Sequence, residues 1–457
     1  MYQSGLPISH VNVASSLRRL GSRRTPVGKS AAITPASTST ADASGGYDIL
    51  ILDAAYKQSL ASARSLGRVG LRVAMAECFV ECDPALPVVG FESRYSSCNV
   101  ILPSYAADPG GFANAVIDFV REHPTRVVLP TGDGIISALM PHRDRLGALG
   151  CVLALAPNSA LEIATDKDRT LEVARKLEID IPRTKRIDSL EDLPAVLAEF
   201  AFPFVLKPSV SWTGLSDRRL LPMEVLDRAE ATDVTEGMLA EGSSVLAQEF
   251  ATGRREGVTL FIVDGQVMAA CAHAAYRTFP PLGGASVMRE SIPILDDIYQ
   301  PAVLLATTIG LEGVCEVEFR RDAAGRPLLM EINPRLAGTI ENAIRSGVDF
   351  PMLIWQWAAG LPVSTVDSYR IGVRTHWLHG ELRWLRDNWR RAGRPDSVPR
   401  GRALCTVLFD LARTRNYDCF DRHDMSPALA ELRHTASSVL KSRTPQTAAT
   451  GLTPKEQ

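Results

Sequence analysis

Residues 315–335 of this chain read CEVEFRRDAAGRPLLMEINPR, and this stretch decides the fold. Two apolar runs flank a short turn that contains glycine, a pattern that predicts an antiparallel β-hairpin. Side chains alternate between the two faces of a strand. Glu331 and Asn333 therefore share one face of the second strand, and Glu316 and Glu318 share one face of the first.

Such a hairpin gathers carboxylates and an amide oxygen in one place, which are hard ligands suited to Mg²⁺. Glutamates on a strand also occur on solvated faces, and the residues alone leave that alternative open. Glu331, however, follows the apolar residues 328–330 and precedes Ile332, so it interrupts a run that reads as buried. A buried carboxylate is costly unless it is paired or bound to a metal.

Residues 330–335 resemble the EINPR strand of the ATP-grasp superfamily, and Glu318 resembles its upstream acidic partner. Further stretches resemble the superfamily's motifs in the same order: residues 166–167 (DK), 202–209 (FPFVLKPS), 247–250 (AQEF) and 280–289 (PPLGGASVMR). The resemblance covers about residues 164–360 and is strongest to carboxylate–amine ligases that act on amino acids or peptides. It implies an N-terminal parallel α/β domain followed by an ATP-grasp fold, a combination of α/β and α+β architecture.

The resemblance also implies a nucleotide site. Lys167 and Lys207 would neutralise phosphate oxygens as compact point charges, with Ser209 beside them. Gln248, Glu249, Phe250 and Ala251 would surround adenine, and Glu256 is a weaker candidate for the ribose or a metal. The loop after Lys207 is poorer in glycine than the family's phosphate-covering loop, which leaves lid closure and substrate shape open.

The cofactors implied are ATP and two Mg²⁺ ions, for which Mn²⁺ can substitute. Glu318, Glu331 and Asn333 would hold the metal, and Arg335 would stabilise the transferring phosphoryl group. Arg277 and Arg289 flank the glycine-containing loop and are candidates for the substrate carboxylate, although each can equally be a surface arginine.

Composition narrows the class of partner. The 457 residues carry 50 basic and 52 acidic side chains, a net charge of about −2 that predicts neither nucleic-acid nor membrane binding. The 8 cysteines form no CxxC pair, so we expect reduced thiols and a cytoplasmic enzyme. Small-molecule carboxylate and amine substrates are the expected partners, and a homodimer is an open alternative.

The amino-acid composition changes along the chain and indicates separate segments. Residues 1–45 are rich in Ser, Thr and Arg, which is typical of a disordered tail and also of a transit peptide. The first strand is followed by no GxGxxG motif, which argues against a dinucleotide site. We expect a tail at 1–45, an α/β domain at 46–160, the ATP-grasp region at 161–360, a helical or mixed segment at 361–440 and a second tail at 441–457.

The function predicted from these features is an ATP- and Mg²⁺-dependent carboxylate–amine ligase that works through an acyl phosphate and releases ADP and phosphate. Two alternatives remain at this stage. One is an ATP-grasp carboxylase that activates bicarbonate, and the other is a regulator that binds a nucleotide without catalysis.

Overall fold

Five parallel strands in the order β3-β2-β1-β4-β5 open the part of the chain that the structure describes. The structure is a computed structural model that describes residues 45–80, 87–213, 219–280, 284–394 and 397–441, without the side chains of 434 and 436–441. Both predicted tails therefore lie outside the described residues, apart from the residues at their inner ends. The described residues all belong to the compact unit Asp42–Gln457.

Helices connect most consecutive strands of this first sheet, as alternating apolar and amphipathic segments predict, and β3 follows β2 without a helix among the described residues. Its strands are β1 (Tyr47–Ile51), β2 (Val73–Glu77), β3 (Ser96–Ile101), β4 (Thr125–Leu129) and β5 (Val152–Leu153). Its helices are α1 (Lys57–Arg68), α2 (Pro109–Glu122), α3 (Asp133–Leu139), the 3₁₀ turn Met140–His142, α4 (Arg143–Gly147) and α5 (Asn158–Ala164). The carboxyl ends of these strands are the edge at which side chains from separate loops meet.

A four-stranded antiparallel sheet in the order β6-β9-β7-β8 follows helix α6 (Lys167–Lys176), and it has a small core of its own. We call this sheet with its helices the lid. Its elements are β6 (Thr184–Ile187), the 3₁₀ turn Leu190–Asp192, α7 (Leu193–Glu199), β7 (Phe204–Pro208), β8 (Met223–Val225), α8 (Arg228–Ala240) and β9 (Val245–Glu249).

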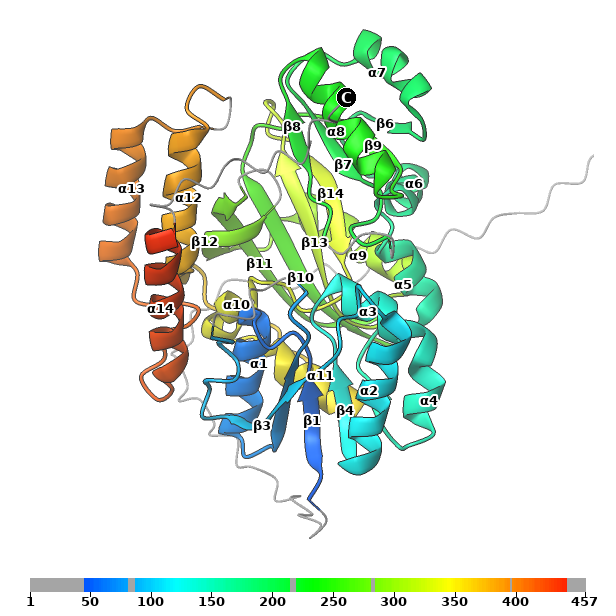
Figure 1. Cartoon of the computed structure of the whole chain (residues 1–457), viewed down its shortest axis with the longest axis vertical. Coiled ribbons are helices and arrows are strands. Elements are labelled where there is room, and N and C mark those ends of the chain that lie inside the picture. The colour runs from blue at the N-terminus through cyan, green and yellow to red at the C-terminus, as the bar shows by residue number, and fades with distance from the viewer. Residues whose placement is uncertain (1–44, 81–86, 214–218, 281–283, 395–396, 442–457) are drawn as a thin grey trace, which may run out of the picture. The chain divides into compact units, whose positions relative to one another are not determined.

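The central sheet has six strands in the order β14-β13-β10-β11-β12-β15, and all its pairs are antiparallel. Its strands are β10 (Arg255–Val263), β11 (Gln266–Phe279), β12 (Ala285–Ile292), β13 (Gly313–Arg321), β14 (Pro327–Asn333) and β15 (Arg374–His376). Helix α9 (Asp296–Ile309) packs on one face. Helices α10 (Ile340–Ser346) and α11 (Phe350–Ala358) pack with α1 on the other (Figure 1).

The predicted hairpin is confirmed as β13 and β14. Glu318 pairs with Glu331 and Glu316 pairs with Asn333, so these side chains share one face of the sheet as the alternation predicts. A β-bulge after Glu318 shifts the register toward the turn. The hairpin therefore places two carboxylates directly opposite one another.

The C-terminal segment carries β15 and then three helices, α12 (Leu378–Arg390), α13 (Arg400–Arg413) and α14 (Ser426–Lys441). Figure 1 shows these helices beside the central sheet. The turn after α12 also reaches the lid, since Arg391 donates to Glu224 (2.6 Å) and Arg394 to Glu230 (2.8 Å). Among the described residues, no helix is both long enough and apolar enough to cross a membrane.

Candidate functional site

Two facing carboxylates form the centre of the candidate site. Glu331 on β14 lies opposite Glu318 on β13, and the Asn333 amide nitrogen lies 3.5 Å from an oxygen of each. Glu318 is only 6% exposed. Like charges placed together in a buried setting repel one another unless a cation or a proton intervenes. The arrangement thus calls for positive charge.

Two lysines supply part of that charge. Lys207 is the last residue but one of the lid strand β7. Lys167 is the first residue of α6, and its Nζ donates to Ser211 Oγ (3.0 Å). Burial lowers the pKa of Lys207 to about 8, although Glu331 partly opposes this effect. Burial also lowers the pKa of Lys167, against the pull of Glu331 and Asp133. Both lysines therefore lie within electrostatic range of Glu331.

The two glutamates respond differently to the same surroundings. Burial raises the pKa of Glu318 to about 7, with Arg255 opposing the rise and Glu331 adding to it. Burial would raise the pKa of Glu331 as well, but Lys167, Arg255 and Lys207 together hold it below its usual value. Near neutral pH the pair carries one firm negative charge and one carboxyl close to its titration point. A divalent cation would ionise both.

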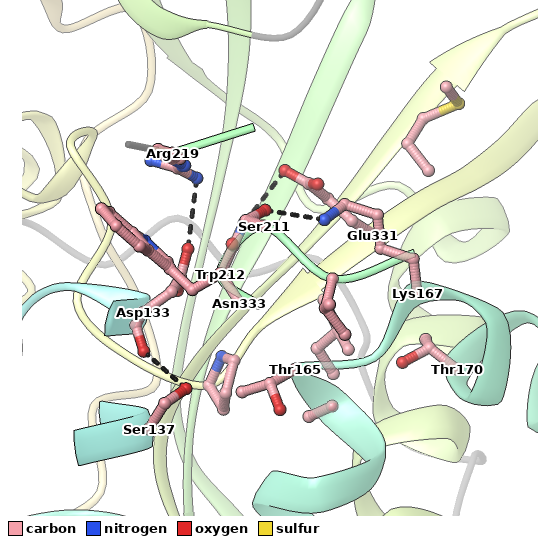
Figure 2. A pocket seen from close by; sticks show the side chains of 15 residues that line it. Asp133, Ser137, Thr165, Lys167, Thr170, Ser211, Trp212, Arg219, Glu331 and Asn333 are labelled. Atoms are coloured by element: carbon pink, nitrogen blue, oxygen red, sulfur yellow. Dashed lines mark hydrogen bonds and ion pairs between the residues drawn. The ribbon is translucent and has the colours of Figure 1, made fainter. Parts of the chain in front are cut away.

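A cavity of about 70 Å³ lies beside these groups (Figure 2). Its walls come from four parts of the chain: α3, the α5–α6 junction, the loop after β7 with Arg219, and β14. Its polar lining comprises Asp133, Ser137, Thr165, Lys167, Thr170, Ser211, Arg219, Glu331 and Asn333. The cavity therefore combines donors for anionic oxygens with carboxylates for a cation.

Arg335 follows β14 and contacts two residues that line this cavity. Its guanidinium forms an ion pair with Asp133 (Nη2 to Oδ2, 2.9 Å) and donates to the Asn333 Oδ1 (3.2 Å). Arg219 also donates to Asp133 (3.2 Å). The two arginines hold the pKa of Asp133 below its usual range even though burial opposes them. Asp133 thus connects the first sheet to the site.

Sequence reasoning missed Asp133, Arg219 and Arg255 as site residues. Asp133 has a recoverable signal, because it follows β4 closely and side chains at the carboxyl ends of parallel strands gather at one edge. Arg255 forms an ion pair with Glu318 and donates to the Gly284 carbonyl (2.7 Å). Its position next to Glu256 in sequence gives no hint of this role.

The residues predicted around adenine lie at the end of β9 and just beyond it. Gln248 is buried and donates to Thr184 Oγ1 (3.1 Å), whereas Glu249 is exposed. Phe250 is half-buried, and the Ala251 carbonyl accepts from Arg320 (2.9 Å). Ser209 is buried, and its carbonyl accepts from the Lys167 amide (2.9 Å). None of these five predicted residues lines the cavity of Figure 2, and their nucleotide contacts stay a prediction.

The structure places Glu256 on the wrong face for the predicted role. Its carboxylate is fully buried and pairs with Arg254 and with Arg321 (2.8 Å). Its strand neighbour Gly257 is the residue that pairs with Glu318, and alternation sends Glu256 to the α9 face. The prediction that Glu256 binds the ribose or a metal is therefore corrected. Its carboxylate instead forms ion pairs with Arg254 and Arg321.

Arg277 and Arg289 are also not brought to the cavity, and neither is a surface arginine. Arg277 is buried and donates to Glu381 (2.9 Å) and Asp410 (2.7 Å). Arg289 has no exposed surface and donates through Nη1 to Asp418 (3.0 Å). Both guanidinium groups are already neutralised by carboxylates of the C-terminal segment. Their predicted role on a substrate carboxylate is corrected to an internal one.

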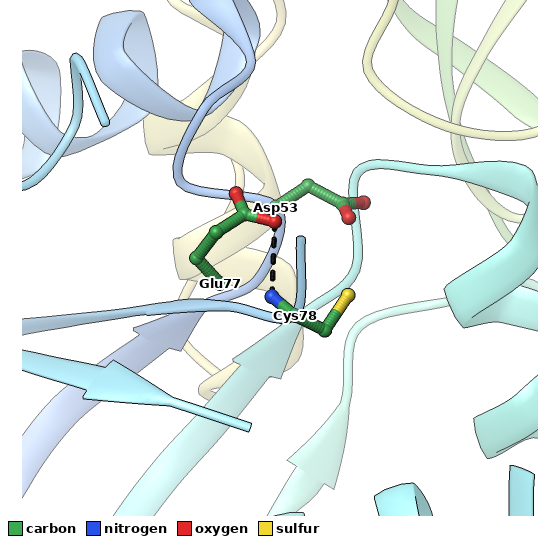
Figure 3. Close-up of side chains that lie close together, drawn as sticks. All are labelled: Asp53, Glu77 and Cys78. Atoms are coloured by element: carbon green, nitrogen blue, oxygen red, sulfur yellow. Dashed lines mark hydrogen bonds between the residues drawn. The ribbon is translucent and has the colours of Figure 1, made fainter. Parts of the chain in front are cut away.

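A second polar cluster lies at the carboxyl ends of β1 and β2, where Asp53, Glu77 and Cys78 approach one another (Figure 3). Glu77 accepts from the amides of Ala55 (2.8 Å), Cys78 (2.9 Å) and Phe79 (3.0 Å). Backbone amides thus donate to both oxygens of the Glu77 carboxylate. We interpret the cluster as a structural support of the loops that follow β1 and β2.

Comparison with known proteins agrees with this geometry. Residues 284–381 match the family described as ATP-grasp in the biosynthetic pathway with Ter operon. D-alanine–D-alanine ligase of Pseudomonas entomophila is 25% identical over 209 residues, which are 43% of this chain and 64% of that relative. The match thus spans less than two thirds of that relative's own length.

Two solved structures share the fold. The L-amino acid ligase from Bacillus licheniformis superposes with a TM-score of 0.51 at 17% identity, over 70% of this chain and 75% of the other. The biotin carboxylase domain of the Hydrogenobacter thermophilus 2-oxoglutarate carboxylase, described as a dimer in complex with MgADP and bicarbonate, gives 0.56 at 15% identity, over 72% and 73%.

The three sheets, the acidic hairpin and the two lysines define an ATP-grasp fold. The chain thus has the ATP-grasp fold, and residues 284–381 match an ATP-grasp family.

Proposed function

We propose that this chain is an ATP-dependent carboxylate–amine ligase that releases ADP and phosphate. The observation that carries the proposal is the facing pair Glu318–Glu331 within electrostatic range of Lys167 and Lys207. A protein that only binds a nucleotide has little need for a buried acidic pair that repels itself. The names of the relatives, a D-alanine–D-alanine ligase and an L-amino acid ligase, favour an amino acid or small peptide as substrate.

The reaction divides into two transfers. A carboxylate oxygen of the first substrate attacks the γ-phosphorus of ATP, the bond to the bridging oxygen breaks, and ADP leaves. The amine nitrogen of the second substrate then attacks the acyl carbon, the carbon–oxygen bond to phosphate breaks, and inorganic phosphate leaves. The amine gives up one proton, and the product is an amide.

The donor set at the hairpin fits Mg²⁺, since Glu318, Glu331 and Asn333 offer hard oxygen ligands and nothing softer. When bound, the metal would supply positive charge where the phosphoryl group transfers. Lys167 and Lys207 would hold phosphate oxygens. The planar guanidinium of Arg335 would donate hydrogen bonds to the transferring phosphoryl group, and Asp133 would fix its orientation.

The test is a screen for ADP release with pairs of amino acids, followed by mass spectrometry of any product. Bicarbonate with a single amino acid forms a separate arm and covers the carboxylase alternative. We expect ADP, phosphate and a product heavier than either substrate. Accumulation of AMP with pyrophosphate would overturn the acyl-phosphate route, because it indicates adenylation of the carboxylate.

A further inference from the structure

A row of paired residues crosses the central sheet from the candidate metal carboxylates. Glu331 pairs with Glu318, Glu318 with Gly257, and Gly257 with His273 on β11. Directly paired residues point to the same face of a sheet. His273 therefore lies on the site face, two strands away from Glu318.

Gly257 lets the imidazole lean toward the carboxylates. A Cβ added at Gly257 would lie only 2.4 Å from the His273 Cε1 atom, a distance that atoms do not tolerate. The ring thus covers Gly257 and reaches toward β13, where its Nδ1 lies 3.9 Å from Glu316 Oε2. A glycine in the middle of a strand often marks such a close approach.

The imidazole of His273 is buried without a hydrogen bond in the part of the chain that the structure describes, although it is only 4% exposed. Burial lowers the pKa of His273 to about 3, so the ring is neutral and offers one N–H and one lone pair. The ring nitrogens of His273 are not among the described side-chain atoms that are fully enclosed without a partner, so they keep some contact with solvent.

The surrounding charge indicates which chemical group the imidazole of His273 would bind. Glu316 and Glu318 lie nearest along the face, and the cation Arg255 beside them is already paired with Glu318. Arg289, farther along, is neutralised by Asp418. These carboxylates would repel a carboxylate of the substrate, whereas they would attract a group that donates N–H hydrogen bonds.

We propose that His273 orients the amine substrate of the ligase through its imidazole, and that Gly257 provides the room for this contact. The inference rests on the proposed function and adds a residue for the second substrate. Glu316 adds negative charge beside the amine. His273 is a positioning residue in this scheme, because the reacting atoms lie at the hairpin.

The experiment uses the full chain labelled with ¹⁵N-histidine and saturated with Mg²⁺ and AMP-PNP, a non-hydrolysable ATP analogue. Ring-nitrogen signals of His273 are assigned by their loss in His273→Gln. The first probe is an equimolar pool of the amides of the common L-amino acids, which carry an amine and no carboxylate. The second probe is the matched pool of N-acetyl amino acids, which carry a carboxylate and no amine.

We expect the amide pool to shift the His273 signals and the N-acetyl pool to leave them in place. Gly257→Ala presses a methyl group against the ring, so we expect it to weaken the response to the amides by at least about tenfold, or ~1.4 kcal/mol. Gly401→Ala is the matched control, because a Cβ added at Gly401 meets nothing within 4 Å. AMP-PNP affinity should be the same in both glycine variants.

Signals that ignore both pools would overturn the inference and show that His273 only packs. Signals that follow the N-acetyl pool, alone or equally, would overturn the assignment to the amine. ADP release from amino-acid pairs with silent His273 signals removes this inference and leaves the proposed function standing. Absence of ADP release with a clear amide response removes the ligase proposal and leaves an amine site at His273.

Discussion

Two buried clusters of charge lie on the same face of the central sheet, and they are built differently. The cluster at the C-terminal segment, called here the brace, comprises Lys57, Arg64, Arg289, Asp418 and Asp424. Arg64 donates to the Asp424 carboxylate (2.8 Å) and to three backbone carbonyls, of Asp418 (3.1 Å), Cys419 (2.8 Å) and Asp424 (2.9 Å). Asp418 receives both Arg289 and Lys57. Each brace arginine thus has a matched carboxylate.

The cluster at the hairpin comprises Lys167, Lys207, Glu318 and Glu331. Among the described residues the side chain of Lys207 has no hydrogen bond, and that of Glu331 has only the 3.5 Å contact with Asn333. Burying charge is costly in both places. In the brace, ion pairs within the chain offset that cost. In the hairpin cluster, charges remain that a phosphate group and a cation would pair with. Buried charges that are fully paired indicate a structural role, and buried charges without a full set of partners indicate a ligand-binding role.

Breaking the brace should have the largest effect on stability. Asp418→Asn leaves Arg289 and Lys57 buried without their counter-charge, and loss of one partner of a buried pair costs about 3–5 kcal/mol. The measurement is the free energy of unfolding in urea. The control is Glu172→Gln, since Glu172 and Lys176 form an exposed pair (2.7 Å) and exposed pairs contribute little to stability. Equal small losses in both variants would contradict the distinction between the clusters.

Breaking the hairpin cluster should affect turnover more than stability. Glu331→Gln keeps the size of the side chain but removes the charge that a metal requires, so we expect ADP release to fall by about 10²–10³-fold. The change removes the repulsion between Glu331 and Glu318 together with the attraction of Lys167 and Lys207. Arg335 keeps its ion pair with Asp133, so the unfolding free energy should change little.

Glu316→Gln is the control for that variant. Glu316 lies on the same strand face but accepts from the Thr339 and Thr259 hydroxyls, and it pairs with Asn333 one position along. We expect its turnover loss to be clearly smaller than that of Glu331→Gln. Equal losses in Glu316→Gln and Glu318→Gln would leave the ligand on β13 undecided, and an active Glu331→Gln enzyme that still requires Mg²⁺ would refute the metal assignment.

A lysine variant should weaken nucleotide binding to a lesser degree. Lys207→Met removes a charged hydrogen-bond donor from the predicted phosphate site, worth about 1.5–3 kcal/mol, or roughly 10–100-fold in the ADP dissociation constant. The fold should be unaffected or slightly stabilised, because a desolvated lysine is lost. Calorimetry with ADP measures the effect, and Lys176→Met on the exposed side of α6 is the control. An unchanged dissociation constant would show that the phosphate site lies elsewhere.

The sequence sufficed for features that are local. The hairpin, its acidic face and the succession of motifs could be predicted because strand alternation and short motifs depend on neighbouring residues. Glu256 was misplaced because alternation says that Glu256 and Gly257 face opposite sides, but only the register with β13 says which side is the site.

The rest depended on contacts between distant segments. Arg277 and Arg289 find carboxylates 104 to 133 residues away, in a segment to which no chemistry could be assigned. Asp133 meets Arg335 across 202 residues. Such pairings follow from the packing of whole domains, which a single sequence does not reveal. The charges themselves were visible in the sequence, and what escaped prediction was whether each had a partner.

The smallest expected effect is the uptake of a fraction of a proton when ADP binds, and it tests the protonation state of Lys207 directly. Its pKa in the free protein is about 8, lowered mainly by burial. A phosphate group placed beside the ammonium favours the charged form and raises this pKa again. Binding of ADP should therefore take up protons where the free lysine is partly neutral, and the uptake attributable to Lys207 should be ~0.5 proton near pH 8 and close to zero near pH 6.5. Calorimetric titrations of Mg²⁺-free ADP in two buffers of different ionisation enthalpy measure this number, and the absence of Mg²⁺ avoids the opposing proton release that a metal would cause at Glu318. Lys207→Met isolates the contribution, since Glu318, with a pKa of about 7, also responds to a phosphate. The same proton uptake in Lys207→Met and in the unaltered chain would mean that Lys207 meets no phosphate, and the hairpin cluster would then need another explanation for its unpaired lysine.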